Sequence, residues 1–177
     1  MRKLSMDELN RISVEEFKKT DKNPIVLILD NIRSLNNVGA AFRTSDAFLI
    51  EKICLCGITG KPPHRDIRKT ALGATESVEW QYYSSTLDAI NECKQRDCKI
   101  IGVEQTENSI SLENFTIDSN TKYALVFGNE VFGVEDEVIK QCHHTLEIPQ
   151  FGTKHSLNIS VSVGVVLWHF VNQILNK

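Results

Sequence analysis

The stretch that decides the fold runs from Ile25 to Arg43 and reads IVLILDNIRSLNNVGAAFR. Its first five residues are all aliphatic, as expected for a strand that is buried on both faces of a sheet. A polar segment follows, and apolar residues then recur at helical spacing from Val38 to Phe48. A buried strand that leads into a helix is typical of sheets whose strands run parallel.

The same alternation of apolar runs and helical patterns continues along the chain. We expect further buried strands at residues 53–56, 99–103, 123–127 and 145–148, and further helices at 87–96, 135–141 and 157–175. This pattern predicts an α/β fold with a mainly parallel sheet and helices on both faces. The main domain should span residues 23–177, with residues 1–22 as an N-terminal helical extension.

Short polar patterns mark several expected helix starts. Ser5-x-x-Glu8 has the form of a capping box and predicts a helix from Ser5 to Lys19. Ser85-x-x-Asp88 has the same form before the helix at 87–96. After the first strand, Asn36 or Asn37 can cap the next helix.

Composition and charge limit the class of protein. The chain has 177 residues, of which 41% are apolar and 24% charged, so we expect one globular domain rather than a disordered or fibrous chain. Its 20 basic and 23 acidic residues give a net charge of -3. A nucleic-acid site would therefore have to be a local basic patch.

The sequence also predicts a cytoplasmic protein. No apolar run reaches the ~18 residues of a membrane span, and the charged first ten residues do not resemble a secretory signal, so no membrane contact is expected. The five cysteines are odd in number and contain no C-x-x-C pair, as expected in a reducing compartment. We expect them to be buried as small apolar side chains.

Several familiar catalytic and metal-binding motifs are absent. The glycines in Gly128-Asn-Glu-Val-Phe-Gly133 have the spacing of a phosphate-binding loop, but Val134 and Glu135 follow where such a loop needs Lys and Ser or Thr. Neither G-x-G-x-x-G nor G-x-S-x-G nor H-E-x-x-H occurs. Cys142-His143-His144 has no second cluster to complete a site, so no metal is expected.

Polar residues follow three of the expected strands. Asp30 to Asn37 comes after the first strand, Gly128-Asn129-Glu130 after the fourth, and Ser156-Leu157-Asn158 shortly after the fifth. Each cluster alone is equally well explained by helix capping, chain turning or a solvated loop charge. Because the carboxyl ends of parallel strands share one edge of a sheet, the three clusters can converge on a ligand crevice.

Three motifs in this order are similar to those of a known enzyme family. Asn37-Val-Gly-Ala-Ala-Phe-Arg43, Leu125-Val-Phe-Gly-Asn-Glu-x-x-Gly133 and Ile148-Pro149 with Ser156-Leu-Asn-Ile-Ser-Val-Ser162 strongly resemble the SpoU/TrmH family of SPOUT (class IV) RNA methyltransferases. The resemblance implies a C-terminal deep trefoil knot and a homodimer. It also implies transfer of a methyl group from S-adenosylmethionine to a ribose 2'-hydroxyl of tRNA or rRNA.

The resemblance also assigns roles to single residues. The catalytic positions that it implies are Arg43, Asn37, Glu130, Ser156 and Asn158. The cofactor-binding positions that it implies are Val103, Glu104, Phe127, Gly128, Ile148, Ser156 and Leu157. A guanidinium has a pKa above ~12, so we expect Arg43 to hold a phosphate and stabilise the developing alkoxide rather than to act as the base.

Cations in the first half of the chain form the expected RNA-binding track. The stretch from Lys61 to Lys69 contains four cations and a histidine. The residues expected to contact RNA phosphates are Arg33, Arg43, Arg65, Arg68 and Lys69. An ordinary solvated loop is the alternative explanation for the stretch 61–69.

The last helix is apolar around most of its circumference. Val163, Val166, Leu167, Phe170 and Ile174 share one side, and Val161, Val165, Trp168 and Leu175 share the opposite side, with a polar stripe of Ser162, His169, Gln173 and Asn176. Two apolar sides need two burial surfaces, so we expect a homodimer through this helix. A helix sunk deep in its own core is the alternative.

Two other functions compete with RNA methylation. One is a non-catalytic RNA-binding or assembly module that retains the knotted fold. The other is an α/β enzyme that acts on a nucleotide or phosphate, for which a strand-end crevice is favourable but a phosphate loop is missing. Retention of S-adenosylmethionine would exclude most of the second, and methyl transfer to RNA would exclude the first.

Overall fold

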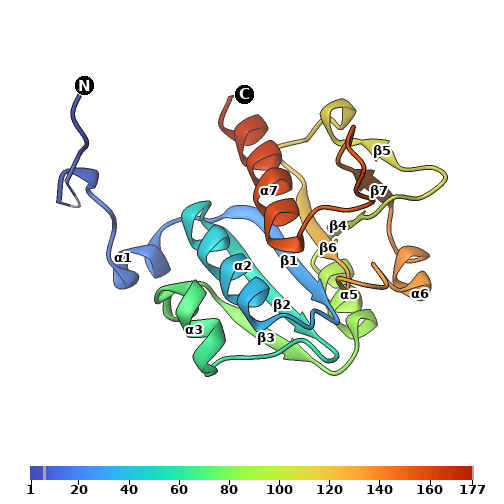
Figure 1. Ribbon diagram of the computed structural model, residues 1–177, viewed down its shortest axis with the longest axis horizontal. Helices are drawn as coiled ribbons and strands as arrows, with labels where there is room; N and C mark the ends of the chain where they lie inside the picture. Colours follow the sequence, from blue (N-terminus) through green and yellow to red (C-terminus); the bar gives the residue numbers. More distant parts are fainter. Residues whose placement is uncertain (6, 177) are drawn as a thin grey trace.

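One sheet of seven parallel strands organises the computed structural model, which describes residues 1–5 and 7–176 (Figure 1). The strands are β1 (Asn23–Asp30), β2 (Ile50–Cys56), β3 (Trp80–Tyr83), β4 (Cys98–Val103), β5 (Ile110–Ser111), β6 (Lys122–Phe127) and β7 (His144–Glu147). Their order across the sheet is β3-β2-β1-β6-β4-β7-β5. The predicted α/β class with a mainly parallel sheet is confirmed.

Strand β1 lies where the strand order changes direction. It pairs with β2 on one side and with β6 on the other, so Leu29 lies opposite both Leu55 and Phe127. The chain builds β2 and β3 outward on one side, and β6, β4, β7 and β5 on the other. Connections leave the carboxyl ends of β1 and β6 in opposite directions, which is the strand order at which open α/β sheets place their ligand sites.

Helices cover both faces of the sheet, as predicted. They are α1 (Val14–Lys19), α2 (Leu35–Ala47), α3 (Arg65–Ala71), α4 (Ala74–Ser77), α5 (Thr86–Gln95), α6 (Asp136–Ile139) and α7 (Ile159–Leu175), with short 3-10 turns at Asp7–Leu9 and Leu112–Asn114. Helices α2 and α7 pack against each other over one face (Figure 1). Helix α5 packs on β1 and β4 from the other face.

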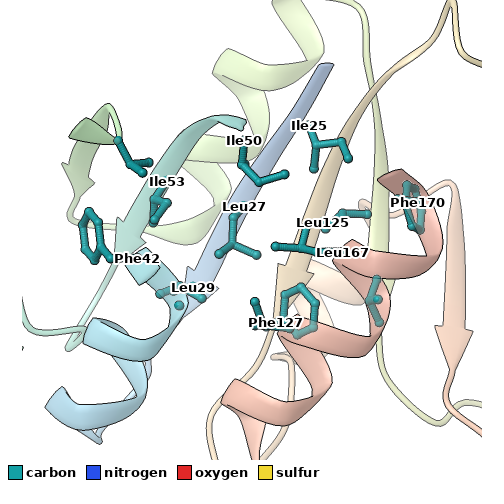
Figure 2. Packing of buried hydrophobic residues seen from close by; sticks show 14 of the residues in the cluster. Ile25, Leu27, Leu29, Phe42, Ile50, Ile53, Leu125, Phe127, Leu167 and Phe170 are labelled. Atoms are coloured by element: carbon teal, nitrogen blue, oxygen red, sulfur yellow. The ribbon is translucent and has the colours of Figure 1, made fainter. Parts of the chain in front are cut away.

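Alternate residues of β1 divide the core into two layers. Ile25, Leu27 and Leu29 are fully buried in the cluster that contains α2 and α7, and Figure 2 shows them beside Leu167 and Phe170. Val26 and Ile28 point to the opposite cluster, which contains Ala89, Ile90 and Cys93 of α5. Burying one such aliphatic side chain is worth about 1.5–3 kcal/mol, so the uninterrupted apolar run stabilises both layers.

Helix starts differ from the expected ones in several places. Ser34, not Asn36 or Asn37, caps α2 by accepting a hydrogen bond from Asn37 N. Ser85 caps α5 as predicted, but its side chain accepts from Leu87 N and forms no reciprocal box with Asp88. Asp88 has the right spacing for a capping box. The box does not form because the Ser85 side chain accepts from the second amide of the helix, that of Leu87, and not from the third, that of Asp88.

The N-terminal helix is shorter than the predicted span of residues 5–19. A 3-10 turn at Asp7–Leu9 is separated from α1 by Asn10, whose φ of +46° interrupts any helix. The capping box is formed by Ser13 and Glu16, at the start of α1. Met6 lies outside the described residues. Phe17 of α1 is buried in the main core, which attaches this segment to the sheet domain.

The sequence patterns missed four short elements. Strand β3 is an edge strand with Gln81 and Tyr82 exposed, so it carries no continuous apolar run. Strand β5 has two residues, and helices α3 and α4 have seven and four, which are too short for a periodic signal. The stretch 61–69, which a solvated loop could also explain, contains the first five of the seven residues of α3.

Helix α7 buries one of its two apolar sides. Val163, Val166, Leu167 and Phe170 are fully buried, whereas Val161, Val165, Trp168 and Leu175 are 50%, 38%, 57% and 71% exposed. The predicted polar stripe is partly engaged, because His169 and Gln173 both hydrogen-bond to the carbonyl of Phe115. The alternative of a helix sunk in its own core is therefore wrong.

The cysteines agree with the sequence expectation. Cys54, Cys56, Cys93 and Cys98 are buried, Cys142 is half-buried, and all five are free thiols. Within residues 1–5 and 7–176, no helix is long and apolar enough to cross a membrane.

Gly39 is the tightest point between α2 and α3 and provides a stability test. A Cβ at this position would lie 2.1 Å from Thr70 Oγ1 and 2.3 Å from the carbonyl oxygen of Ile67. Overpacking of this kind costs about 1–3 kcal/mol, against a gain in helix propensity of at most ~1 kcal/mol. We expect Gly39→Ala to lower the free energy of unfolding in a urea titration.

Gly152→Ala is the matched control for this measurement, because a Cβ at Gly152 has no atom within 4 Å. Its midpoint should equal that of the wild type. An unchanged midpoint for Gly39→Ala would contradict the close packing of α3 on α2.

Candidate active site

A cavity of about 780 Å³ lies at the carboxyl ends of β4, β6 and β7. This volume falls within the ~300–1,000 Å³ of small-molecule sites in proteins. All seven positions predicted to contact a cofactor line the cavity: Val103, Glu104, Phe127, Gly128, Ile148, Ser156 and Leu157. The structure therefore brings them together, and their role in binding stays a prediction.

One wall of the cavity is fixed by backbone contact. A Cβ at Gly128 would lie 2.1 Å from Gly133 C and from Val134 N, so only glycine allows the segment after β6 to fold back this closely. The Glu104 carboxylate accepts hydrogen bonds from Val134 N at 3.0 Å and from Gln105 N at 2.9 Å. These contacts hold the ends of β4 and β6 in one arrangement beside the cavity.

Glu130 joins the segment after β6 to the segment after β1. Its Oε2 accepts from Arg33 N at 2.9 Å, and its Oε1 accepts from Ser34 N and from Asn37 Nδ2, both at 3.0 Å. Residues 93 to 97 positions apart in the sequence are thus linked by one carboxylate. The link lies at the carboxyl ends of the neighbouring strands β1 and β6, and Glu130 also lines the cavity.

The same contacts set the charge of Glu130. Partial burial opposes ionisation, but hydrogen bonds from the backbone of Arg33 and Ser34 and from the Asn37 amide outweigh it and hold the pKa of Glu130 below its ordinary value of 4.5. Glu130 is therefore a carboxylate at neutral pH.

Asn37 and Asn158 extend this link to the last helix. Asn158 Nδ2 donates to Asn37 Oδ1 at 3.3 Å, while Asn37 Nδ2 donates to Glu130. Asn158 also caps α7, because its Oδ1 accepts from Ser160 N at 2.8 Å. Three of the predicted catalytic residues therefore form one hydrogen-bonded chain, and all three sequence motifs meet in it.

The other two predicted catalytic residues stand apart from this chain. Ser156 is exposed, lines the cavity and makes no side-chain hydrogen bond to any described residue. Arg43 is exposed on α2, six residues beyond Asn37, which is about 9 Å along a helix axis. Its guanidinium has no ion pair or hydrogen bond with the part of the chain that is described, so the single chain does not bring it to Glu130.

The predicted RNA-binding cations lie in separate places. Arg65, Arg68 and Lys69 line a surface hollow of about 500 Å³ together with Pro63, His64 and Leu72. Arg33 is exposed beside Glu130, and neither it nor Arg43 lines the hollow. Within the described residues, no cluster of histidine, cysteine or carboxylate side chains could hold a metal ion.

Sequence reasoning placed Asn31 and Asn129 in the polar clusters but assigned neither of them a role in supporting the site. Asn129 is 8% exposed, and its Nδ2 donates to the Asn31 carbonyl at 2.7 Å. Asn31 has a φ of +56°, and its Oδ1 accepts from Ile58 N at 3.0 Å. Asparagine tolerates the left-handed region better than most residues. An asparagine directly after a buried strand therefore indicates a sharp turn of the chain at that point.

The lowered pKa of Glu130 gives a pH-dependent prediction. A carboxylate whose pKa is lower in the folded state stabilises the fold above its unfolded pKa, and this contribution is lost as the pH falls through the folded pKa. Glu130→Gln removes the charge at every pH. The difference in free energy of unfolding between wild type and Glu130→Gln should be largest near neutral pH and shrink below the ordinary value of 4.5.

Urea titrations of both proteins at neutral pH and at about pH 4 measure this difference. A difference that stays constant across the range would show that Glu130 is not held as a carboxylate by its donors.

Comparison with known proteins places the chain in a family. The model of the SpoU rRNA Methylase family matches residues 24–168. A 23S rRNA (guanosine-2'-O-)-methyltransferase of Haemophilus ducreyi is 29% identical over 170 residues, which cover 96% of this chain and 68% of that protein. The chain spans 62–68% of the length of three such rRNA methyltransferases.

Solved structures agree with this result. The TrmH/SpoU tRNA modifying enzyme of A. aeolicus superposes with a TM-score of 0.80 at 25% identity, over 93% of this chain and 81% of that chain. The SpoU methyltransferase AviRb of Streptomyces viridochromogenes, solved in complex with AdoMet, gives a TM-score of 0.80 at 18% identity, over 92% and 65% of the two chains. Because the family match extends from β1 into α7 and includes all three motifs that meet at Glu130, this chain belongs to the SpoU rRNA Methylase family.

Proposed function

We propose that this protein transfers a methyl group from S-adenosylmethionine to a ribose 2'-hydroxyl of tRNA or rRNA. The observation that carries the proposal is the hydrogen-bonded chain of Asn158, Asn37 and Glu130, which lies beside the cavity that all seven cofactor positions line. Family membership supports the reaction class. The relatives named above include both an rRNA methyltransferase and a tRNA modifying enzyme, so both RNA classes belong to the proposal.

The cavity suits a cofactor with an adenine and an amino-acid group. Its wall combines the buried apolar side chains of Phe127 and Leu146 with the polar backbone of residues 128–134. The close approach at Gly128 leaves no room for a side chain, which keeps that backbone exposed to the cavity. S-adenosylmethionine, when bound, supplies a methyl group on a sulfonium centre that needs no metal to react.

The residues of this chain orient the reaction. Both carboxylate oxygens of Glu130 are occupied by N–H donors, and its lowered pKa keeps it ionised, so Glu130 positions the segment 33–37 rather than taking a proton. Asn37 is held from both ends by Glu130 and Asn158. Ser156 has a free hydroxyl at the cavity and is the group that can contact an incoming ribose.

Arg43 supplies positive charge without proton transfer. A guanidinium stays protonated, and its planar fork can bridge a phosphate and a developing ribose alkoxide. Its exposed side chain, which has no ion pair within the described residues, is available for an RNA phosphate. The exposed cations Arg33, Arg65, Arg68 and Lys69 extend the proposed phosphate track.

The proposed assembly is a homodimer through α7. The exposed side of this helix contains Val161, Val165, Trp168 and Leu175, and large contiguous apolar patches are rare on monomeric proteins. Trp168 lies beside Phe48, with ring centroids 6.1 Å apart, so the apolar side continues onto the end of α2. A contiguous apolar face of this kind suits a second copy of the same chain.

The proposed C-terminal trefoil knot is supported by contacts at both ends of the final segment. Gln105 Nε2 donates to the His155 carbonyl at 3.0 Å, and Ile117 N donates to Gln173 Oε1 at 3.0 Å. The segment that includes α7 is thus held at two points by the connection between β4 and β6.

The five free cysteines support a reducing, cytoplasmic location.

Arg43 provides the test of the reaction. With bulk tRNA or rRNA and labelled S-adenosylmethionine, Arg43→Ala should lower turnover by roughly 100-fold or more, because charge that develops only in the transition state loses its partner. Arg43→Lys should recover little activity, since lysine keeps the charge but loses the planar fork. Cofactor affinity and the thermal midpoint should stay near those of the wild type.

Ribose methylation by Arg43→Ala at a near-normal rate would refute the role of Arg43. Absence of methyl transfer by the wild type to either RNA class, together with intact RNA binding, would favour the non-catalytic RNA-binding module.

The dimer is tested by charging the exposed side of α7. Val165→Glu with Trp168→Glu places two carboxylates on this face, so the protein should become monomeric in light scattering. Lys99→Glu, an exposed position at β4, is a control for added negative charge and should keep the wild-type mass. A double variant of unchanged mass would move the interface away from α7.

A further inference from the structure

The turn from Asn129 to Gly133 exposes two large apolar side chains at the rim of the cavity. Val131 is 64% exposed and Phe132 is 84% exposed, and both line the cavity. They lie on the same turn as Glu130, whose carboxylate points away toward residues 33–37. An RNA ribose that reaches the Glu130–Asn37–Asn158 chain must therefore pass close to this turn.

The turn is held rigidly, so the exposure of Phe132 is a feature of the fold. Asn129 N donates to Gly133 O and Gly133 N donates to Asn129 O, both at 2.9 Å. Asn129 Oδ1 accepts from Val131 N at 2.9 Å and from Phe132 N at 3.2 Å. Asn129 Nδ2 anchors the turn to the Asn31 carbonyl. Five hydrogen bonds thus fix the backbone from which the Phe132 side chain extends into solvent.

A cation accompanies the exposed ring. Glu130 Oε2 accepts from Arg33 N, so the turn and Arg33 are joined through one carboxylate. The Arg33 side chain is exposed and makes no ion pair within the described residues. Exposed aromatic rings and free cations are the side chains that proteins use to stack unpaired nucleobases and to hold the phosphates between them, and the Phe132 turn and Arg33 are linked through Glu130.

We propose that Phe132 stacks on a nucleobase of the bound RNA at the mouth of the cavity, beside the ribose that receives the methyl group. The proposal rests on the proposed function for its choice of RNA. A second copy of the chain is the competing occupant, but the exposed side of α7 already offers that copy four large apolar side chains, against two on this turn. Stacking leaves the base identity open while fixing the position of the nucleotide.

The test measures binding of a fluorescent, single-stranded decaribonucleotide pool of random sequence. Phe132→Ala should weaken binding roughly 5- to 150-fold, the loss of one stacked base. Phe132→Leu keeps apolar bulk without an aromatic face and should be nearly as weak, whereas Phe132→Tyr restores the ring and should restore affinity. Ile58→Ala is the matched control, because Ile58 is 66% exposed and does not line the cavity.

A second probe isolates the base from the backbone. The same pool made with abasic ribose should bind the wild type and Phe132→Ala equally, because only the phosphates remain to be contacted. Equal affinity of wild type and Phe132→Ala for the pool with bases would overturn the proposal. So would a loss of S-adenosylmethionine affinity alone, which would make Phe132 a wall of the cofactor cavity.

Two further outcomes separate this proposal from the others. A monomeric mass for Phe132→Ala in light scattering would show that a second copy covers the ring, and would overturn the stacking role. The wild type could also bind the pool with bases more tightly than Phe132→Ala does and yet transfer no methyl group. That result would support stacking and refute the proposed reaction.

Discussion

The parallel pairing of β1 with β6 is the constraint on which the rest of the structure depends. Both strands are buried on both faces, and their register sets Leu29 opposite Phe127 at the carboxyl edge. Their following segments must therefore leave the sheet side by side. Glu130 can reach Arg33, Ser34 and Asn37 only because this pairing brings the two segments together.

The Glu130 carboxylate has both a structural and an electrostatic effect. Because Glu130 accepts N–H donors on both oxygens, it fixes the start of α2, and the same donors keep it ionised. It follows that a residue in a catalytic motif can act by positioning others. Asn37, held between Glu130 and Asn158, links this arrangement to the cap of α7, so the fold of the last helix and the geometry of the site are coupled.

Three chemically different surfaces lie on different elements of the protein. The exposed side of α7 is apolar, the hollow at α3 is cationic, and the turn after β6 presents an aromatic ring at the cavity rim. A net charge of -3 does not oppose RNA binding in this arrangement, because the cations of α3 are concentrated on one short helix. In the proposed function, RNA phosphates, a nucleobase and a second copy of the chain would each contact a different one of these three surfaces.

The amino-acid sequence by itself determined the α/β class, five of the seven strands and the grouping of three motifs, because aliphatic runs such as Ile25–Leu29 must be buried in any fold. Periodicity could not reveal β3, β5, α3 or α4, which are too short or too exposed to repeat a pattern. Only the tertiary structure decided that Asn37 contacts both Glu130 and Asn158 while Arg43 contacts neither. The partners of Asn37 lie 93 and 121 positions away in the sequence, and contacts over such separations depend on strand order. The roles of Asn31 and Asn129 were equally hidden, because each acts through backbone groups of segments that only the assembled sheet brings within hydrogen-bonding distance.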